Sequence, residues 1–111
     1  MSEIKEGDKL YLVTRKDLSP GQRAVQAAHA LQEFAIEYPE TNRAWYDNSN
    51  YLAILEVENE EALEALAGEA HGNFFQTVWF YEPDMENQLT AIAIEPQGGK
   101  RLCSNLPLAL R

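Results

Sequence analysis

The sequence predicts one α/β domain over residues 1–111, with a mixed four-stranded sheet covered by helices in the order β-α-β-α-β-β. Three observations support this fold class. The chain is long enough to bury one hydrophobic core without disulfides, and a second domain is not expected. Short apolar, β-branched runs alternate with longer amphipathic runs. The last two strand-like runs are joined by only seven residues, EPDMENQ, which favours an antiparallel pair.

The first strand is expected at residues 10–14 and the first helix at residues 20–37. LYLVT is short, apolar and β-branched, as in a strand covered on both faces. Ser19 is a favourable N-cap, and Pro20 suits the first helical position, where its missing N–H costs nothing. On a helical wheel one side is expected to face the core, and it is formed by Ala24, Ala28, Leu31, Ala35 and Tyr38, with Ala27 and Phe34 at its edge. The opposite side is formed by Gln22, Gln26, His29 and Glu33.

The middle of the chain predicts a loop, a strand and a second helix. Residues 39–50 (PETNRAWYDNSN) contain turn formers without a period, which predicts a surface loop. Residues 51–57 (YLAILEV) predict a buried strand. Asn59 is expected to cap a helix that ends near Gly72 and faces inward through Leu63, Leu66 and Ala70.

The last two strands are expected at residues 74–81 and 89–95. The remainder, QGGKRLCSNLPLALR, predicts a turn of helix and a packed tail. Its single cysteine, Cys103, has no CxxC or Cys/His companion, so neither a disulfide nor a structural zinc site is expected, and a semi-buried free thiol is.

Composition restricts the function classes. The N-terminus lacks the apolar core of a signal peptide, and no apolar run approaches the roughly 20 residues that span a bilayer. A cytoplasmic protein that does not insert into a membrane is therefore expected. No GxSxG, GxxxxGK[ST] or GxGxxG motif is present, which removes the usual support for a nucleophilic serine, nucleotide hydrolysis and hydride transfer.

The formal net charge of -9 is unevenly distributed along the chain. Residues 1–30 hold five basic and four acidic side chains, residues 31–99 hold one basic and fourteen acidic, and the last twelve hold three basic and no acidic. Broad adhesion to nucleic acid is disfavoured because phosphate contacts need Lys and Arg. An anionic ligand is expected near Arg15, Lys16 and Arg23, and at the C-terminal segment. Solubility alone is the alternative explanation of the acid excess.

The turn between the first strand and the first helix has the densest cluster of functional side chains. The first N–H groups of a helix have no internal partners, so anions and developing oxyanions bind there. Gly21 would let a ligand approach the backbone, and it is surrounded by Arg15, Lys16, Asp17, Gln22 and Arg23. Simple helix capping by Ser-Pro-Gly is the alternative explanation.

A second cluster lies between the last two strands: Glu82, Asp84, Glu86, Asn87 and Gln88. Crowded carboxylates can raise one another's pKa, which would suit a general base. Hard metal ligation is a weaker alternative because no calcium-loop spacing is present, and an acidic solvated turn is another. His29, on the first helix, fits either a hydrogen-bonded structural histidine or a catalytic one.

The segment VTRKDLSPGQRAVQAAHA resembles the N-terminal signature of the type 2, archaeal and eukaryotic, peptidyl-tRNA hydrolases. That signature has an Arg-x-Asp-Leu strand end, a glycine turn and a helix reading Ala-x-Gln-x-x-His-Ala. The matching positions are Arg15, Asp17, Leu18, Gly21, Ala24, Gln26, His29 and Ala30. YEPDMENQLTAIAIEP is similar to the family's second signature, an Asp-led loop that returns through a Thr-containing strand, and the matches are Asp84, Thr90 and Pro96.

The sequence also departs from that family's pattern. Members usually carry Gly-Lys-Gly-Lys before the helix, whereas this chain is two residues shorter there and has Gln22 in place of the lysine implicated in catalysis. Lys16 or Arg23 would be the nearest replacement for that cation. The Asp-led loop also lacks the family's Gly-Arg-Thr-Gln run. Two shortened loops predict a divergent, bacterial-type member with a changed substrate or a lost reaction.

The resemblance implies an esterase that cleaves the bond between a peptide and the terminal ribose of tRNA with an activated water, without a metal or other cofactor. Asp84 would orient or deprotonate the water, and Thr90 would hold that carboxylate or the substrate by its hydroxyl. The N–H groups of Gly21 and Gln22 would bind the oxyanion or a 3′-end phosphate. The peptidyl-tRNA or tRNA 3′ end would be contacted by Arg15, Lys16, Asp17, Gly21, Arg23, Gln26 and His29.

A second function class remains open from the sequence. The missing lysine and the acidic middle also fit a catalytically lapsed homologue that binds a tRNA end, a nucleotide or a protein partner through the same crevice. A homodimer is compatible with either function, because the apolar Val25 and Ile36 flank the polar side of the first helix.

Overall fold

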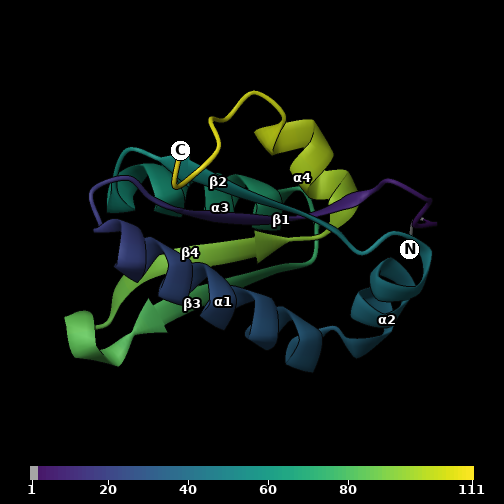
Figure 1. Ribbon diagram of the computed structural model, residues 1–111, viewed down its shortest axis with the longest axis horizontal. Coiled ribbons are helices and arrows are strands. Elements are labelled where there is room, and N and C mark those ends of the chain that lie inside the picture. Colours follow the sequence, from purple (N-terminus) through teal and green to yellow (C-terminus); the bar gives the residue numbers. More distant parts are fainter. Residues whose placement is uncertain (1–2) are drawn as a thin grey trace.

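In the computed structural model, which describes residues 3–111, a mixed four-stranded sheet lies between two layers of helices (Figure 1). The first two residues of the expected 1–111 domain lie outside this range. The strand order is β2-β1-β4-β3, with β1 and β2 parallel and β4 antiparallel to both of its neighbours. The strands are β1 (Lys9–Arg15), β2 (Tyr51–Val57), β3 (Thr77–Glu82) and β4 (Gln88–Ile94). The predicted fold class and the antiparallel closing pair are confirmed.

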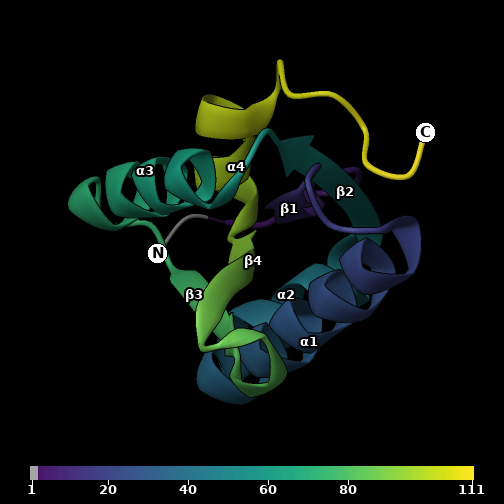
Figure 2. The same cartoon turned by 90° about the vertical axis from the view of Figure 1, so that its left-hand side faces the viewer.

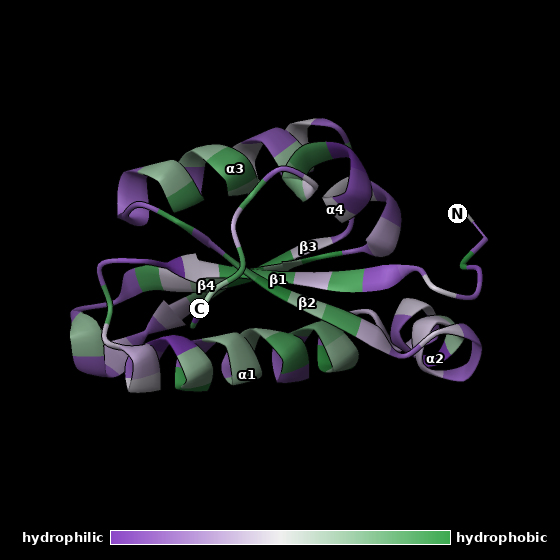
Figure 3. Ribbon diagram, turned by 45° about the horizontal axis from the view of Figure 1, so that its top comes forward, coloured by the Kyte–Doolittle hydropathy of each residue, from purple (hydrophilic) through white to green (hydrophobic). Residues whose placement is uncertain are grey.

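Helices cover both faces of the sheet, as Figures 2 and 3 show. They are α1 (Pro20–Glu37), α2 (Pro39–Asn48), α3 (Glu60–Gly72) and α4 (Pro96–Cys103), and the 3-10 helix η1 (Pro83–Met85) joins β3 to β4. None of the helices in residues 3–111 has both the length and the hydropathy needed to cross a membrane.

The central strand β1 supplies both cores. Leu10 and Leu12 belong to the cluster that packs against α1 and its buried Phe34. Tyr11 and Val13 alternate with them and belong to the cluster that packs against α3 and α4. Because both faces of this strand are buried, its sequence is a continuous apolar run rather than an alternating one.

Residues 39–50 were expected to form a loop, and this prediction is wrong for residues 39–48, which form α2. Pro39 occupies the first helical position, where proline is tolerated. Thr41 and Trp45, one turn apart, are buried against the α1 side of the sheet, and Trp45 Nε1 donates a hydrogen bond of 2.7 Å to the Tyr51 carbonyl. Two buried positions in ten residues are too few to produce a visible period.

The expected inward face of α1 is confirmed only in part: Ala27 and Phe34 are buried, and Leu31 and Tyr38 pack against the same cluster, but the centre of the buried face is displaced. Ala24 and Ala28 are exposed, and the buried residues are Gln26, Ala27, Ala30 and Phe34. A hydropathy wheel assigns glutamine to solvent, but Gln26 finds polar partners on β3 and β4 that allow it to be buried. The helix is therefore rotated so that one polar side chain lies within its packed face.

Helix α4 packs unusually close to the sheet. A Cβ atom added to Gly99 would lie 2.1 Å from the Tyr11 ring, and one added to Gly98 would lie 2.6 Å from Phe75. Where the sequence predicted a turn of helix, the structure has eight residues of helix. The two adjacent glycines allow α4 to approach the sheet this closely, because only residues without a side chain fit at these two contacts.

The C-terminal tail crosses the outer edge of β2. Leu108 forms an antiparallel bridge with Leu55, the Glu56 N–H donates to the Pro107 carbonyl at 3.1 Å, and the Ala109 N–H donates to the Ile54 carbonyl at 2.9 Å. The expected packed tail is thus attached through backbone hydrogen bonds to one half of an edge strand.

We expect Gly99→Ala to lower the free energy of unfolding, because a methyl group forced against the Tyr11 ring costs about 1–3 kcal/mol or more. Gly68→Ala in α3 is the matched control. A Cβ there meets no atom within 4 Å, so alanine should stabilise its helix by about 0.8–1 kcal/mol. Urea unfolding curves measure both changes. An unchanged midpoint for Gly99→Ala would contradict the packing described here.

Candidate functional site

The two motif segments of the sequence meet at one end of the sheet, where β1 ends and β4 begins (Figure 1). The Thr14 hydroxyl donates a hydrogen bond of 2.8 Å to the Thr90 carbonyl. Arg15 Nη1 donates to Gln88 Oε1 at 2.9 Å and to the Leu89 carbonyl at 3.1 Å. Segments more than seventy residues apart in sequence are therefore joined directly.

Thr90 lies at a β-bulge. The pairing of β3 with β4 shifts so that Phe80 lies opposite Ala91 while Tyr81 lies opposite Leu89, which leaves Thr90 as the extra residue. Such a bulge redirects a side chain that regular alternation would place on the other face. Here the Thr90 hydroxyl points toward α1 and donates a hydrogen bond of 2.6 Å to Gln26 Oε1.

The Gln26 amide continues this chain of hydrogen bonds to Glu82. Its Nε2 donates to Glu82 Oε1 at 2.9 Å, while Gln26 and Thr90 are buried. The Gln26 hydrogen bond lowers the pKa of Glu82, against a smaller opposing effect of desolvation, and the Asp84 N–H and the charge of His29 also lower it. Glu82 therefore remains a carboxylate at neutral pH. The sequence placed it among the crowded acids but gave no indication of its partner on α1.

Asp84 lies in η1, next to this chain of hydrogen bonds. Its backbone N–H lies 3.4 Å from Glu82 Oε2, and its exposed carboxylate forms no hydrogen bond with any residue of 3–111. Glu86 and Asn87, both at φ 58°, complete the turn back into β4. The Thr90 hydroxyl, expected to hold the Asp84 carboxylate or the substrate, instead contacts Gln26.

Gln22 takes part in a capping box at the start of α1. Its Oε1 accepts from the Ser19 N–H at 3.1 Å, and its own N–H donates to Ser19 Oγ at 3.2 Å. One of the two backbone N–H groups expected to bind an oxyanion is thus already paired. The surface at Gly21 is open, since an added Cβ would meet no atom within 4 Å.

Arg15 and Asp17 form a bidentate ion pair. Arg15 Nε and Nη2 donate to the two Asp17 carboxylate oxygens at 3.0 and 2.9 Å. These hydrogen bonds lower the pKa of Asp17 and raise that of Arg15. The pair lines an open pocket of about 320 Å³ together with Asn59, Glu60, Glu61 and Gln88. Glu60 and Glu61 add two further acids to this pocket. Arg15 therefore stabilises the turn through Asp17, and its charge is not available to bind phosphate.

The other two expected cations lie toward β2. Arg23 Nη1 forms an ion pair with Glu56 Oε1 at 2.8 Å, and its Nε donates to the Leu18 carbonyl. Lys16 is exposed, forms no ion pair with residues 3–111, and lines a pocket of about 360 Å³ with Glu56, Val57, Glu58, Ala62, Leu106 and Pro107. Of the three cations predicted at the site, only Lys16 carries an uncommitted charge.

The His29 ring stacks on Phe80, with centroids 4.6 Å apart and planes 10° from parallel. Since it lies three residues after Gln26 on α1, its ring is close to the hairpin rather than on the solvent side of the helix. His29 thus lies near Glu82, whose pKa its charge helps to lower.

Neither a metal cluster nor a reactive thiol accompanies these residues. Within residues 3–111, no three or more His, Cys, Asp or Glu side chains are arranged to hold a metal ion. Cys103 is fully buried, rather than semi-buried as expected, and burial raises the pKa of its thiol to about 11. The thiol is therefore protonated at neutral pH and is a poor nucleophile.

Thr90→Val should lower the free energy of unfolding by about 1–3 kcal/mol, because it leaves the buried Gln26 oxygen without its donor. Thr90→Ser keeps the hydroxyl and loses one methyl group, so it should cost only about 0.8 kcal/mol. Urea unfolding compares the two variants. Equal destabilisation would mean that the hydroxyl contributes nothing and only packing matters.

Asp17→Asn tests the ion pair through its pH dependence. The pKa of Asp17 in the folded state lies below its ordinary value of 3.8, so the native state binds fewer protons and the pair's stabilisation is present above that pH. We expect the variant to be less stable at pH 7, with the difference shrinking as the pH falls below 3.8 in thermal unfolding. Asp47→Asn, which breaks the exposed Arg43 pair, should change stability less at pH 7. A pH-independent difference for Asp17→Asn would contradict this account.

Comparison with known proteins identifies the family and supports the fold. A family model described as peptidyl-tRNA hydrolase PTH2 matches residues 8–104, a range that includes β1, α4 and both motif segments. A solved structure of a protein of unknown function, Atu0240 from Agrobacterium tumefaciens strain C58, has the same fold, with a TM-score of 0.65 and 14% identity over 90% of this chain and 96% of that chain. No curated protein matches this sequence. The chain belongs to the PTH2 family of peptidyl-tRNA hydrolases.

Proposed function

We propose that this protein hydrolyses the ester between a peptide and the 3′-terminal ribose of tRNA, using a water activated by Asp84. Family membership supports the reaction class. The observation that carries the choice of site is the chain of hydrogen bonds from Thr90 through Gln26 to Glu82, because it joins the two motif segments beside Asp84. A site assembled from segments far apart in sequence, each held by buried polar groups, is typical of preorganised catalysis.

Asp84 is the proposed base. Its carboxylate has no hydrogen-bond partner in residues 3–111, so it can accept a hydrogen bond from water and then the proton. Glu82 accepts from the Asp84 backbone N–H and from Gln26, which favours a fixed position for η1. In this proposal Thr90 and Gln26 are positioning residues that act through Glu82.

The start of α1 is the proposed site for the developing oxyanion. The Gly21 N–H lies in the first turn of α1, at the positive end of the helix dipole, and a Cβ added to Gly21 would meet no atom within 4 Å. The Gln22 side chain uses its oxygen for Ser19 and keeps two N–H donors available, so it would stabilise the oxyanion as a neutral donor. A neutral amide stabilises negative charge less than an ammonium does, so slower turnover than in lysine-containing relatives is expected.

The substrate contacts follow from the side chains around this region. His29 has one ring face on Phe80, and its other face is proposed to stack on a base of the tRNA 3′ end. Lys16 is proposed to approach a phosphate, because its charge is unpaired within residues 3–111. Arg15, Asp17 and Arg23 then act by holding the turn in place.

One observation favours a second function, a tRNA-end binding module without catalysis. Two of the three cations expected to assist hydrolysis are committed elsewhere, Arg15 to Asp17 and Arg23 to Glu56, and the Gln22 side chain takes part in a capping box. Such a module would keep the fold and the crevice but not the rate acceleration.

Release of peptide from peptidyl-tRNA distinguishes these functions. We expect Asp84→Asn to lower kcat/KM by about 100-fold or more, the range of general-base catalysis. Glu86→Gln removes the same charge from the same turn and should stay within about twofold if only long-range screened electrostatics change. Equal rates for Asp84→Asn and the unaltered protein would remove Asp84 from the mechanism. Salt-sensitive tRNA binding without hydrolysis would favour the binding module.

Gln22→Lys tests the oxyanion site separately. If the neutral amide limits the rate, the added ammonium should raise kcat, while the lost capping bond lowers stability by up to about 1 kcal/mol. Single-turnover hydrolysis and thermal unfolding measure the two effects. An unchanged kcat in a folded variant would place the oxyanion elsewhere.

A further inference from the structure

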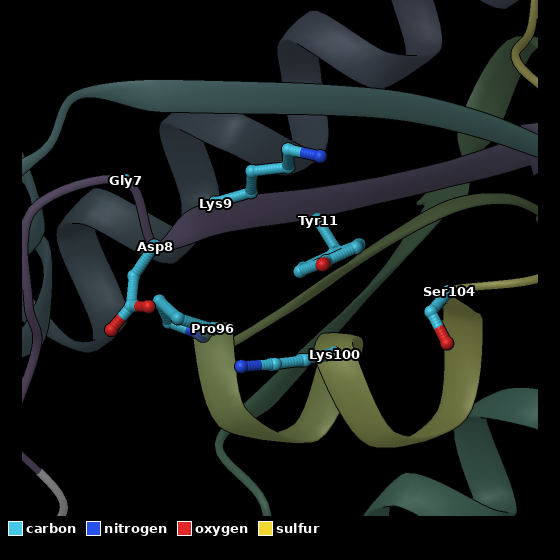
Figure 4. A pocket seen from close by; sticks show the side chains of 7 residues that line it. All are labelled: Gly7, Asp8, Lys9, Tyr11, Pro96, Lys100 and Ser104. Atoms are coloured by element: carbon cyan, nitrogen blue, oxygen red, sulfur yellow. The ribbon is translucent and has the colours of Figure 1, made fainter.

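A second pocket lies at the opposite end of β1 from the candidate site. It has a volume of about 260 Å³ and is lined by Gly7, Asp8, Lys9, Tyr11, Pro96, Lys100 and Ser104 (Figure 4). Its walls are the start of β1, the turn before it and α4. None of these residues takes part in the proposed hydrolysis.

Tyr11 is a buried side chain with an unused polar group. It is 8% exposed, and its hydroxyl forms no hydrogen bond with residues 3–111. Since no fully buried side-chain N or O atom in that range lacks a partner, the hydroxyl reaches solvent through the pocket. Burial, with smaller effects of Cys103 and Asp8, raises the pKa of Tyr11, so the hydroxyl is a donor at neutral pH. A hydroxyl that opens into a pocket and has no partner within residues 3–111 is a candidate ligand contact.

The packing of α4 fixes the position of this hydroxyl. Gly99 lies against the Tyr11 ring, where any Cβ would clash at 2.1 Å. That contact places Lys100 and Ser104 beside the ring, and Figure 4 shows Tyr11 between Lys9 on β1 and Lys100 on α4. Four donor-bearing side chains from two elements thus line one small pocket.

Charge favours an anion in this pocket. Lys9 and Lys100 form no ion pair with residues 3–111, whereas Arg15, Arg23 and Arg43 are all paired. The one acid in the lining, Asp8, accepts a hydrogen bond from the Lys5 N–H at 2.8 Å and closes the turn at Gly7, where φ is +87°. Two ammonium groups and one carboxylate give this pocket lining a net positive charge in a chain of formal charge -9.

We propose that this pocket binds a phosphomonoester, with Lys9 and Lys100 neutralising the dianion and the hydroxyls of Tyr11 and Ser104 donating to its oxygens. Ammonium and hydroxyl donors suit the several acceptor oxygens of a phosphate. The pocket has room for the phosphate and part of its alcohol. The alcohol belongs either to a free nucleotide or to the 5′ end of an RNA. This site is independent of the proposed hydrolysis, since it shares no residue with it.

Titration calorimetry of the full chain with AMP at low salt tests the site, with adenosine as the ligand lacking phosphate. AMP should bind at least about tenfold more tightly than adenosine, because hydrogen bonds to charged groups contribute enough binding free energy to account for that ratio of affinities. Lys100→Gln should weaken AMP binding by about tenfold, and the control Arg101→Gln, on the next residue of α4 outside the lining, by less than about twofold. Tyr11→Phe should weaken it by about threefold or more through loss of the hydroxyl alone.

Asp8→Asn keeps an acceptor for Lys5 and removes the opposing charge, so it should tighten AMP binding. Asp84→Asn should leave AMP binding unchanged, which separates this site from the hydrolase site. An RNA oligonucleotide with and without a 5′-phosphate then shows which molecule supplies the phosphate. Binding that needs the 5′-phosphate and is tighter than AMP binding assigns the RNA end. Binding no tighter than that of AMP assigns a free nucleotide. Equal affinity for AMP and adenosine, or equal loss in Lys100→Gln and Arg101→Gln, would overturn the proposal.

Discussion

The buried amide of Gln26 is the constraint on which the rest of the candidate site depends. An amide inside a packed helix face must pair both its oxygen and its nitrogen, and here the partners come from two different strands, Thr90 on β4 and Glu82 on β3. Meeting that requirement needs the extra residue in β4 and fixes the rotation of α1 about its axis. The hairpin that carries Asp84 is thereby held against the helix that follows β1.

The distribution of paired and unpaired charge divides the molecule into two ends. Where β1 ends, the guanidinium groups of Arg15 and Arg23 are neutralised within the protein, and of the three cations there only Lys16 forms no ion pair with residues 3–111. Where β1 begins, Lys9 and Lys100 remain free. The acidic composition therefore does not exclude anion binding, which is favoured wherever a cation has no internal ion-pair partner.

The sequence predicted elements whose signals are local and failed where partners are distant. Ser19 and Pro20 defined the start of α1, and the apolar run of β2 was located to the residue. The α2 segment was missed because only Thr41 and Trp45 are buried. At the candidate site, the motifs singled out Thr90, Gln26 and Asp84, but the β-bulge and the Glu82 contact depend on strand register, which a one-dimensional pattern does not contain. The ion pairs of Arg15 and Arg23 could not be predicted either, because they depend on how the folded chain places these side chains.

The tail attached to β2 has a consequence for how these molecules behave at high concentration. A sheet edge with open backbone donors and acceptors is a template on which another chain can add a strand. Pro107 and Ala109 occupy the groups of Ile54 and Glu56 that would otherwise be offered in this way. Residues 107–109 thus disfavour intermolecular β-pairing at this part of the edge, and Pro107 contributes because it has no N–H with which to extend the sheet further.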